Sequence, residues 1–300
     1  EEMPADAKSP ATAAAAAQDP EAELRSLPDT LVWEYRPVEG SDELVITLSP
    51  SRTFLMSQTK FARNTLLMSD KKGSYYTFKA SFVVKVLVEF IARHGFKKVL
   101  FVGSSKGAFG AMLYAGHCAQ RDRKRPYYCL AFSPQVSLYP PNPHLADLPS
   151  YGGLLSRLSK DQGLRISVER SPDAHLVEWV RNLHVVIVYS ELYEQDVKEQ
   201  ARLCAPNIRK YPVPFTLHAS IMPFNMRGFD EDDVRQRVRL MYRTKNADAD
   251  LAATLPEEWG DLVGWITGNK WVPSVLGLID EMMSVEVDLC GLPPLRPKKA

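Results

Sequence analysis

Val99-Leu100-Phe101-Val102-Gly103-Ser104-Ser105-Lys106-Gly107 is the stretch of sequence that decides the predicted fold. Its first four residues form the continuous apolar run that is typical of a buried strand. Gly103 and Gly107 then flank Ser105 at the G-x-S-x-G spacing, in which two glycines let a strand turn sharply into a helix without side-chain collisions. We therefore predict that Ser105 is a nucleophile, which this turn lifts above the edge of a sheet.

The sequence on either side of the turn supports this interpretation. Apolar residues recur with a helical period over Phe82 to Arg93, and Gly95 supplies a stop before the strand. The small and apolar residues after the turn suit a helix that packs closely on a sheet. The alternative is a glycine-rich turn that binds phosphate at a helix N-terminus. The spacing of Gly103, Gly107 and Gly110 matches neither the P-loop nor the dinucleotide-binding pattern.

Strands and helices alternate along the rest of the chain. Apolar, β-branched and aromatic runs predict strands over residues 31–35, 44–48, 64–69, 127–132, 185–189 and 215–217. Helices are expected near 173–181 and 196–203, a long Pro-rich loop over 133–153, and mainly helical structure beyond Gly228. This alternation predicts an α/β fold with a mostly parallel sheet, helices on both of its faces and a helical C-terminal extension.

Composition divides the chain into three parts. Residues 1–29 are rich in Ala, Pro, Asp and Glu and have no apolar stripe, which predicts a disordered linker or tail. Residues 30–228 are predicted to form the catalytic domain, and residues 229–300 a helical C-terminal extension or lid. Because the chain does not begin with methionine, additional domains in a longer parent protein remain open.

Charge and cysteine content exclude several classes of function. The 37 basic and 36 acidic residues nearly balance, so no overall field would gather nucleic acid or an anionic membrane. The cysteines lack the close spacing of zinc or redox sites, so we expect reduced thiols, no metal and no cofactor: Cys118, Cys129, Cys204 and Cys290. No run approaches the roughly 18 apolar residues that span a bilayer, and the N-terminus lacks signal-peptide features. The prediction is a cytoplasmic protein that acts on a small-molecule or glycan ester.

A serine hydroxyl needs a histidine to take its proton and an acid to orient that histidine. After a turn of this kind, the acid and then the histidine follow along the chain. His175 falls on a predicted helix, and His184 opens a strand at the edge away from the site. His218 follows the predicted strand 215–217, at the sheet edge where ligands bind. We predict that His218 is the base, against the alternative of an ordinary surface or capping histidine.

The acid is expected after the preceding strand, where three carboxylates occur. We favour Asp196, because it stands where the loop gives way to the predicted helix. Glu191 and Glu194 are the substitutes. The alternative role for Asp196 is simple capping of that helix, an ordinary use of aspartate.

An oxyanion hole needs backbone N–H groups beside the nucleophile. Lys106, which follows Ser105, is expected to supply the first. The second is expected from the loop after the strand 44–48, where Pro50 has no N–H to donate. The second donor is therefore Ser51 or Arg52, although the Arg52 side chain could instead meet an anionic substrate group or face solvent.

These motifs together resemble the α/β-hydrolase superfamily over Leu31 to Phe224. The resemblance is carried by Ile46 to Pro50, by Asn64 to Tyr76, by the serine turn, and by the order strand, acid, strand, histidine. The arrangement is similar to bacterial hydrolase-like proteins of surface-polysaccharide and accessory-secretion systems, some of which are glycan acetyltransferase-like. The resemblance implies an α/β-hydrolase-like sheet, a triad of Ser105, His218 and Asp196 or a neighbouring glutamate, and acyl-ester chemistry.

Two groups of aromatic residues can be interpreted as binding or as structural. Asp70 beside Tyr75 and Tyr76 could bind a sugar, but a turn aspartate with packed tyrosines fits equally well, so we leave them outside the site. Three tryptophans at near-helical spacing could line a glycan surface, but such residues more often mark a small helical core or lid: Trp259, Trp265 and Trp271.

The leading hypothesis is a serine esterase or acyltransferase. Ser105 attacks an ester carbonyl, His218 shuttles the proton, and water or a sugar hydroxyl accepts the acyl group. The alternative is a catalytically inactive hydrolase fold that binds a glycan or a protein partner, since a fold does not fix a function.

Overall fold

A computed structural model describes residues 19–146, 148–245, 255–268 and 273–287. In these ranges seven strands form one sheet, in the order β1-β3-β2-β4-β5-β6-β7. Their bounds are β1 Leu31–Arg36, β2 Glu43–Ser49, β3 Asn64–Asp70, β4 Lys98–Ser104, β5 Tyr127–Phe132, β6 Leu183–Ser190 and β7 Ile208–Val213. Only β1 runs antiparallel to its neighbour β3, and all other pairs are parallel.

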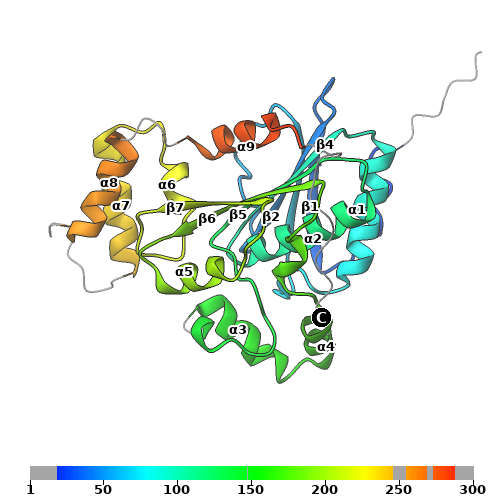
Figure 1. Cartoon of the computed structure of the whole chain (residues 1–300), viewed down its shortest axis with the longest axis horizontal. Coiled ribbons are helices and arrows are strands. Elements are labelled where there is room, and N and C mark those ends of the chain that lie inside the picture. The colour runs from blue at the N-terminus through cyan, green and yellow to red at the C-terminus, as the bar shows by residue number, and fades with distance from the viewer. Residues whose placement is uncertain (1–18, 147, 246–254, 269–272, 288–300) are drawn as a thin grey trace, which may run out of the picture.

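Helices cover both faces of this sheet (Figure 1). The helices are α1 Ala80–Arg93, α2 Lys106–Arg121, α3 Pro149–Leu158, α4 Gln162–Arg170, α5 Glu194–Ala201, α6 Met222–Asn225, α7 Glu231–Lys245, α8 Glu257–Gly268 and α9 Val275–Ser284. Short 3-10 turns lie at η1 Leu24–Ser26, η2 Pro143–Leu145 and η3 Ala174–Val177. The predicted α/β fold is confirmed, including its mostly parallel sheet and the helices after the core.

The alternation of side chains along each central strand explains the two layers. In β4, Val99 and Phe101 belong to a core shared with α1 and α2, whereas Leu100 and Val102 belong to a second core shared with α6 to α9. Both faces are therefore apolar, which is why the sequence of β4 is a continuous apolar run.

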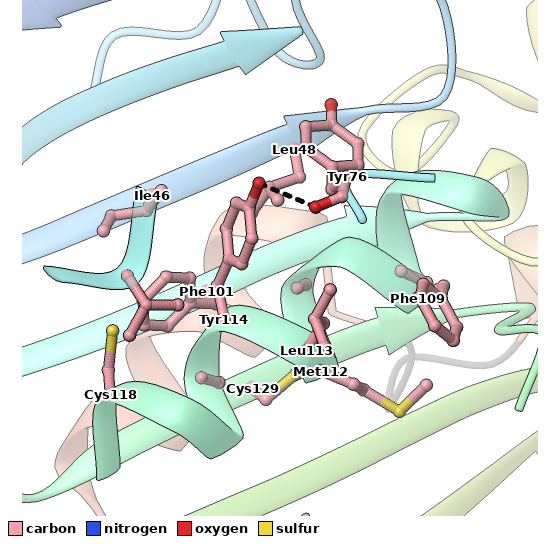
Figure 2. Close-up of a cluster of buried hydrophobic side chains, with 14 of the residues drawn as sticks. Ile46, Leu48, Tyr76, Phe101, Phe109, Met112, Leu113, Tyr114, Cys118 and Cys129 are labelled. Carbon is pink, nitrogen blue, oxygen red and sulfur yellow. Dashed lines mark hydrogen bonds between the residues drawn. The ribbon is translucent and has the colours of Figure 1, made fainter. Parts of the chain in front are cut away.

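Helix α2 lies close to the sheet because its inner face carries small residues. Figure 2 shows its side chains among those of β2, β4 and β5, with the Tyr114 hydroxyl bonded to the Tyr76 carbonyl at 3.0 Å. A Cβ at Gly110 would lie 2.5 Å from the Tyr76 ring. This close packing fixes the start of α2 and therefore the position of Ser105, the residue before the helix.

Three predicted elements differ from the structure. The last strand is β7, whereas residues 215–217 form a loop beyond it. Phe215 is apolar because it packs on Trp259, with ring centroids 5.5 Å apart. The predicted helix near 173–181 is only the short turn η3. The expected Pro-rich loop already contains the start of α3, and α4 follows it.

The predicted tail also ends earlier than residue 29. Leu24 is fully buried, and the Glu23 carboxylate pairs with Arg93 of α1. His94 lies 2.9 Å from the Pro20 carbonyl. Residues 19–29 therefore pack on the domain and are not part of a disordered tail, and residues 1–18 lie outside the described ranges.

The helices beyond Gly228 form part of the second core. Trp259 is 4% exposed in that core, and Trp265 packs on Phe224 with ring centroids 6.0 Å apart. These two tryptophans are therefore structural, while Trp271 lies outside the described residues. In the described ranges no helix has the length and apolar composition that a membrane crossing requires.

Candidate active site

Ser105 occupies a strained turn between β4 and α2. Its backbone has φ 53° and ψ −122°, a conformation that residues with a side chain rarely adopt. A Cβ at Gly103 would lie 2.1 Å from the Gly107 carbonyl oxygen, and a Cβ at Gly107 would lie 2.1 Å from that of Leu48. Both glycines are therefore required, for the steric reason that the G-x-S-x-G spacing predicts.

The structure brings Ser105, His218 and Asp196 into one hydrogen-bonded chain. Ser105 Oγ lies 2.8 Å from His218 Nε2, and His218 Nδ1 lies 2.6 Å from Asp196 Oδ1. The His218 side chain is 14% exposed and that of Asp196 is 1% exposed. A carboxylate on Nδ1 favours the tautomer whose Nε2 is free to accept the serine proton.

Asp196 is held by both of its oxygens. Oδ2 accepts hydrogen bonds from the Ser133 hydroxyl at 2.6 Å and the Ser190 backbone N–H at 3.1 Å. It does not cap α5, because that helix already begins at Glu194 and Tyr193 stands at its N-cap. The capping alternative is therefore wrong, and the carboxylate instead faces the histidine.

The other candidates lie apart from this chain of hydrogen bonds. Glu191 is exposed, and Glu194 forms an ion pair with Lys198 at 2.5 Å. His175 Nδ1 lies 2.8 Å from Glu178 on the η3 turn. His184 is on β6 at the opposite edge of the sheet, where partial burial lowers its pKa.

Of the predicted oxyanion donors, Lys106 has the most suitable position. As the first residue of α2 it has no helical acceptor for its N–H, and the helix N-terminus favours negative charge there. Burial lowers the pKa of its ammonium group, which nearby Asp70 partly offsets. The Ser51 N–H already donates to Ser49 Oγ at 3.1 Å, whereas that of Arg52 has no acceptor in the described part of the chain.

Sequence reasoning missed the residues that follow β5. Ser133 bonds Asp196, and Gln135 Nε2 lies 2.9 Å from His218 Nε2. Their backbone is anchored by Glu199, a buried carboxylate of α5 that accepts from the Val136 N–H. The signal that could have found them is position, since the carboxyl ends of adjacent parallel strands meet at one edge of the sheet.

Asp70, Tyr75 and Tyr76 have structural roles. The buried Asp70 carboxylate accepts from the N–H groups of Gly73 and Tyr76 at 3.0 and 3.1 Å and from the Ser74 hydroxyl at 3.0 Å. It thereby stabilises the turn after β3, as the structural interpretation predicted.

Within the described ranges no group of three or more His, Cys, Asp or Glu side chains could hold a metal ion. Cys118, Cys129 and Cys204 are free thiols, and Cys290 lies outside the described residues.

Comparisons with known proteins give similarity at the level of the backbone. Neither a scan against protein-family models nor a search of curated proteins found a match. Among solved structures, the N-formylmaleamic acid deformylase Nfo from Pseudomonas putida S16 is 16% identical, with 63% of this chain and 89% of that chain covered and a TM-score of 0.37.

Two further structures have similar values. MGS-MChE2, an α/β-hydrolase enzyme from a lagoon-sediment metagenome, is 11% identical over 74% of this chain and 98% of its own, with a TM-score of 0.42. The hydrolase olei00960 from Oleispira antarctica is 11% identical, with 62% of this chain and 87% of that chain covered and a TM-score of 0.40. The activities in these names belong to those proteins, and the chemistry open to this chain depends on its own residues.

Proposed function

We propose that this protein is a serine-dependent acyl-ester hydrolase or acyltransferase. The observation that carries the proposal is the continuous hydrogen-bonded chain from the Ser105 hydroxyl through His218 to the buried Asp196 carboxylate. Its members follow the ends of β4, β6 and β7 at one edge of the sheet, in the order serine, acid, histidine.

The reaction uses the described geometry in two steps. Ser105 Oγ attacks the ester carbonyl while His218 Nε2 takes its proton, and the Lys106 N–H stabilises the oxyanion. The bond from carbon to the ester oxygen then breaks, His218 returns the proton to the leaving alcohol, and the acyl group stays on Ser105. In the second step an acceptor hydroxyl loses its proton to His218 and attacks the acyl carbon. The bond from that carbon to Ser105 Oγ then breaks, and His218 passes the proton to Oγ.

The acyl acceptor is water in the hydrolase and a sugar hydroxyl in the acyltransferase. Both reactions use the same residues, so they differ only in which hydroxyl reaches His218. The resemblance to proteins of polysaccharide systems supports a glycan acyl ester as the substrate. An assay that follows both free acid and acylated glycan would separate the two reactions.

A fluorophosphonate probe tests the proposal directly. It should label the wild-type protein at Ser105 and leave Ser105→Ala unlabelled, because only an activated hydroxyl displaces fluoride from the probe. A folded wild-type protein that stays unlabelled while a reference serine hydrolase reacts would overturn the proposal. That result would favour a catalytically inactive fold that binds a glycan or a protein partner.

A further inference from the structure

Gln135 is a fully buried amide at the reacting end of the proposed triad. It belongs to the loop after β5 and none of its surface is exposed. Its Nε2 lies 2.9 Å from His218 Nε2 and 3.5 Å from Ser105 Oγ. Its Oε1 is buried and has no hydrogen-bond partner in the described part of the protein.

The loop that carries Gln135 is held firmly in place. Ser133, two residues earlier, bonds Asp196 and lies 2.8 Å from the Ser220 hydroxyl. Val136, the next residue, donates its N–H to Glu199. These neighbours hold the Gln135 amide beside the reacting atoms of Ser105 and His218.

Two hydrogen-bond donors lie within reach of His218 Nε2, but this nitrogen can accept only one hydrogen bond. With a proton on Nδ1, Nε2 has one lone pair. The Ser105 hydroxyl at 2.8 Å and the Gln135 amide at 2.9 Å both lie within reach of it. When the Ser105 hydroxyl donates to this lone pair, the Gln135 amide keeps only its long 3.5 Å hydrogen bond to Ser105 Oγ and can donate to a better acceptor.

The position of that acceptor follows from the chemistry. The oxygen that leaves in the first step receives its proton from His218 Nε2, and the oxygen that attacks in the second step gives its proton to the same atom. Either oxygen must therefore lie within hydrogen-bond reach of Nε2 and close to Ser105 Oγ. Gln135 Nε2 borders this space, because it lies 2.9 Å from His218 Nε2 and 3.5 Å from Ser105 Oγ.

We propose that Gln135 is a catalytic residue that binds the alcohol oxygen of the substrate, an inference that rests on the proposed function. Its amide N–H donates to the leaving oxygen as the carbon–oxygen bond breaks and negative charge develops there. In the second step the attacking oxygen occupies the same place beside Gln135 Nε2, and the amide N–H donates to it while its proton passes to His218. No atom is gained or lost by Gln135.

Two esters of one acid distinguish this role from others. A p-nitrophenyl ester releases a phenolate that needs little help to leave, whereas a methyl ester releases a far more basic alkoxide. We expect Gln135→Met, which keeps the length of the side chain but removes its hydrogen bonds, to lower kcat/KM for the methyl ester on the order of tenfold. The p-nitrophenyl ester and the rate of fluorophosphonate labelling should change less than about twofold, because kcat/KM reports the first step and fluoride also leaves easily.

Gln200→Met is the matched control. Gln200 lies on α5, and its buried Oε1 likewise lacks a partner among the described residues, but it does not contact Ser105 or His218. It should leave both esters unchanged. Equal losses for both esters and the probe in Gln135→Met would overturn the proposal, because they would show that Gln135 holds His218 or binds the oxyanion. Unchanged kinetics would also overturn it. Failure of the wild-type protein to be labelled would instead refute the proposed function itself.

Discussion

Asp196 is the residue at which orientation of His218 can be tested most sharply. One oxygen meets His218 Nδ1 at 2.6 Å, and the other is fixed by Ser133 and Ser190. In Asp196→Asn, either the amide or its oxygen can face the histidine, and the existing donors to Oδ2 favour keeping the oxygen on their side. The amide would then donate to Nδ1 and turn Nε2 into a donor, which is the wrong tautomer for accepting the serine proton.

We expect Asp196→Asn to lower kcat for an ester substrate by about 10⁴-fold with little change in melting temperature. Glu191→Gln is the control, because that side chain is exposed and stands five residues earlier, in the turn before α5. It should be nearly silent. A rate for Asp196→Asn within about tenfold of the wild type would show that the carboxylate is not needed to orient His218.

The turn from β4 to α2 depends on two glycines that no other residue can replace. A Cβ at Gly107 would lie 2.1 Å from the Leu48 carbonyl oxygen, a backbone atom that cannot rotate away. We expect Gly107→Ala to lower the free energy of unfolding by about 1–3 kcal/mol, as overpacking does. Because α2 would shift away from β2, probe labelling at Ser105 should also slow down.

Gly260→Ala provides the comparison. Gly260 lies in α8, and apart from its chain neighbours and the nearby backbone of its own helix no described atom stands within 4 Å of an added Cβ. In a helix interior alanine is more favourable than glycine by about 1 kcal/mol. This variant should therefore be as stable as the wild type or more stable. Urea unfolding of both variants checks the pair, and similar effects of the two substitutions would contradict the steric explanation.

The elements that could be predicted from the sequence are those whose own pattern is strong. The apolar run of β4, the serine turn and the helical period of α1 each carry their signal within about a dozen residues. His218 and Asp196 could be proposed because the order of motifs is characteristic. Their mutual distances depend on where β6 and β7 end, and no local pattern encodes that.

The elements that were missed owe their form to distant partners. β7 is the last strand in the sheet order, and its Arg209 and Lys210 side chains are exposed. Its sequence therefore lacks the expected apolar run. Leu24 looked like part of a tail because the α1 surface that buries it begins more than fifty residues later. Gln135 sits in a Pro-rich stretch without periodicity, and only the convergence of β5, β6 and β7 brings it to His218.

The sheet has two ends: the functional edge, where the carboxyl ends of the parallel strands lie, and the opposite edge, where their amino ends lie. Ser105, Gln135, Asp196 and His218 all follow the carboxyl ends of parallel strands, where the strand order brings them together. The amino ends of the strands lie at the other edge, and His184 stands there as the second residue of β6. His117 lies near the end of α2, which runs from the functional edge towards the opposite one. These two histidines can therefore affect stability without touching the reaction.

The stability of the folded chain should depend on pH through this pair. Burial lowers the pKa of His117, with a contribution from Arg121, and burial likewise lowers that of His184, with a contribution from Arg209. The unfolded chain takes up protons at the ordinary histidine pKa of about 6.5, whereas the folded chain resists them. The stabilising effect is therefore complete above about pH 6.5 and is lost as pH falls through the lower folded pKa values.

Replacing both histidines with glutamine should remove this dependence, because glutamine does not titrate. We expect the free energy of unfolding of the double variant to fall less between pH 7.5 and pH 5.5 than that of the wild type, as measured by urea denaturation at both values. The quantity compared is the change in the free energy of unfolding between the two pH values, because the substitutions also change packing at any one pH. The remaining titrating groups contribute equally to both proteins. Parallel losses of stability in the two proteins would show that neither histidine resists protonation in the folded state. Probe labelling of Ser105 at pH 7.5 should be the same in both, since these side chains lie away from the edge that carries the triad.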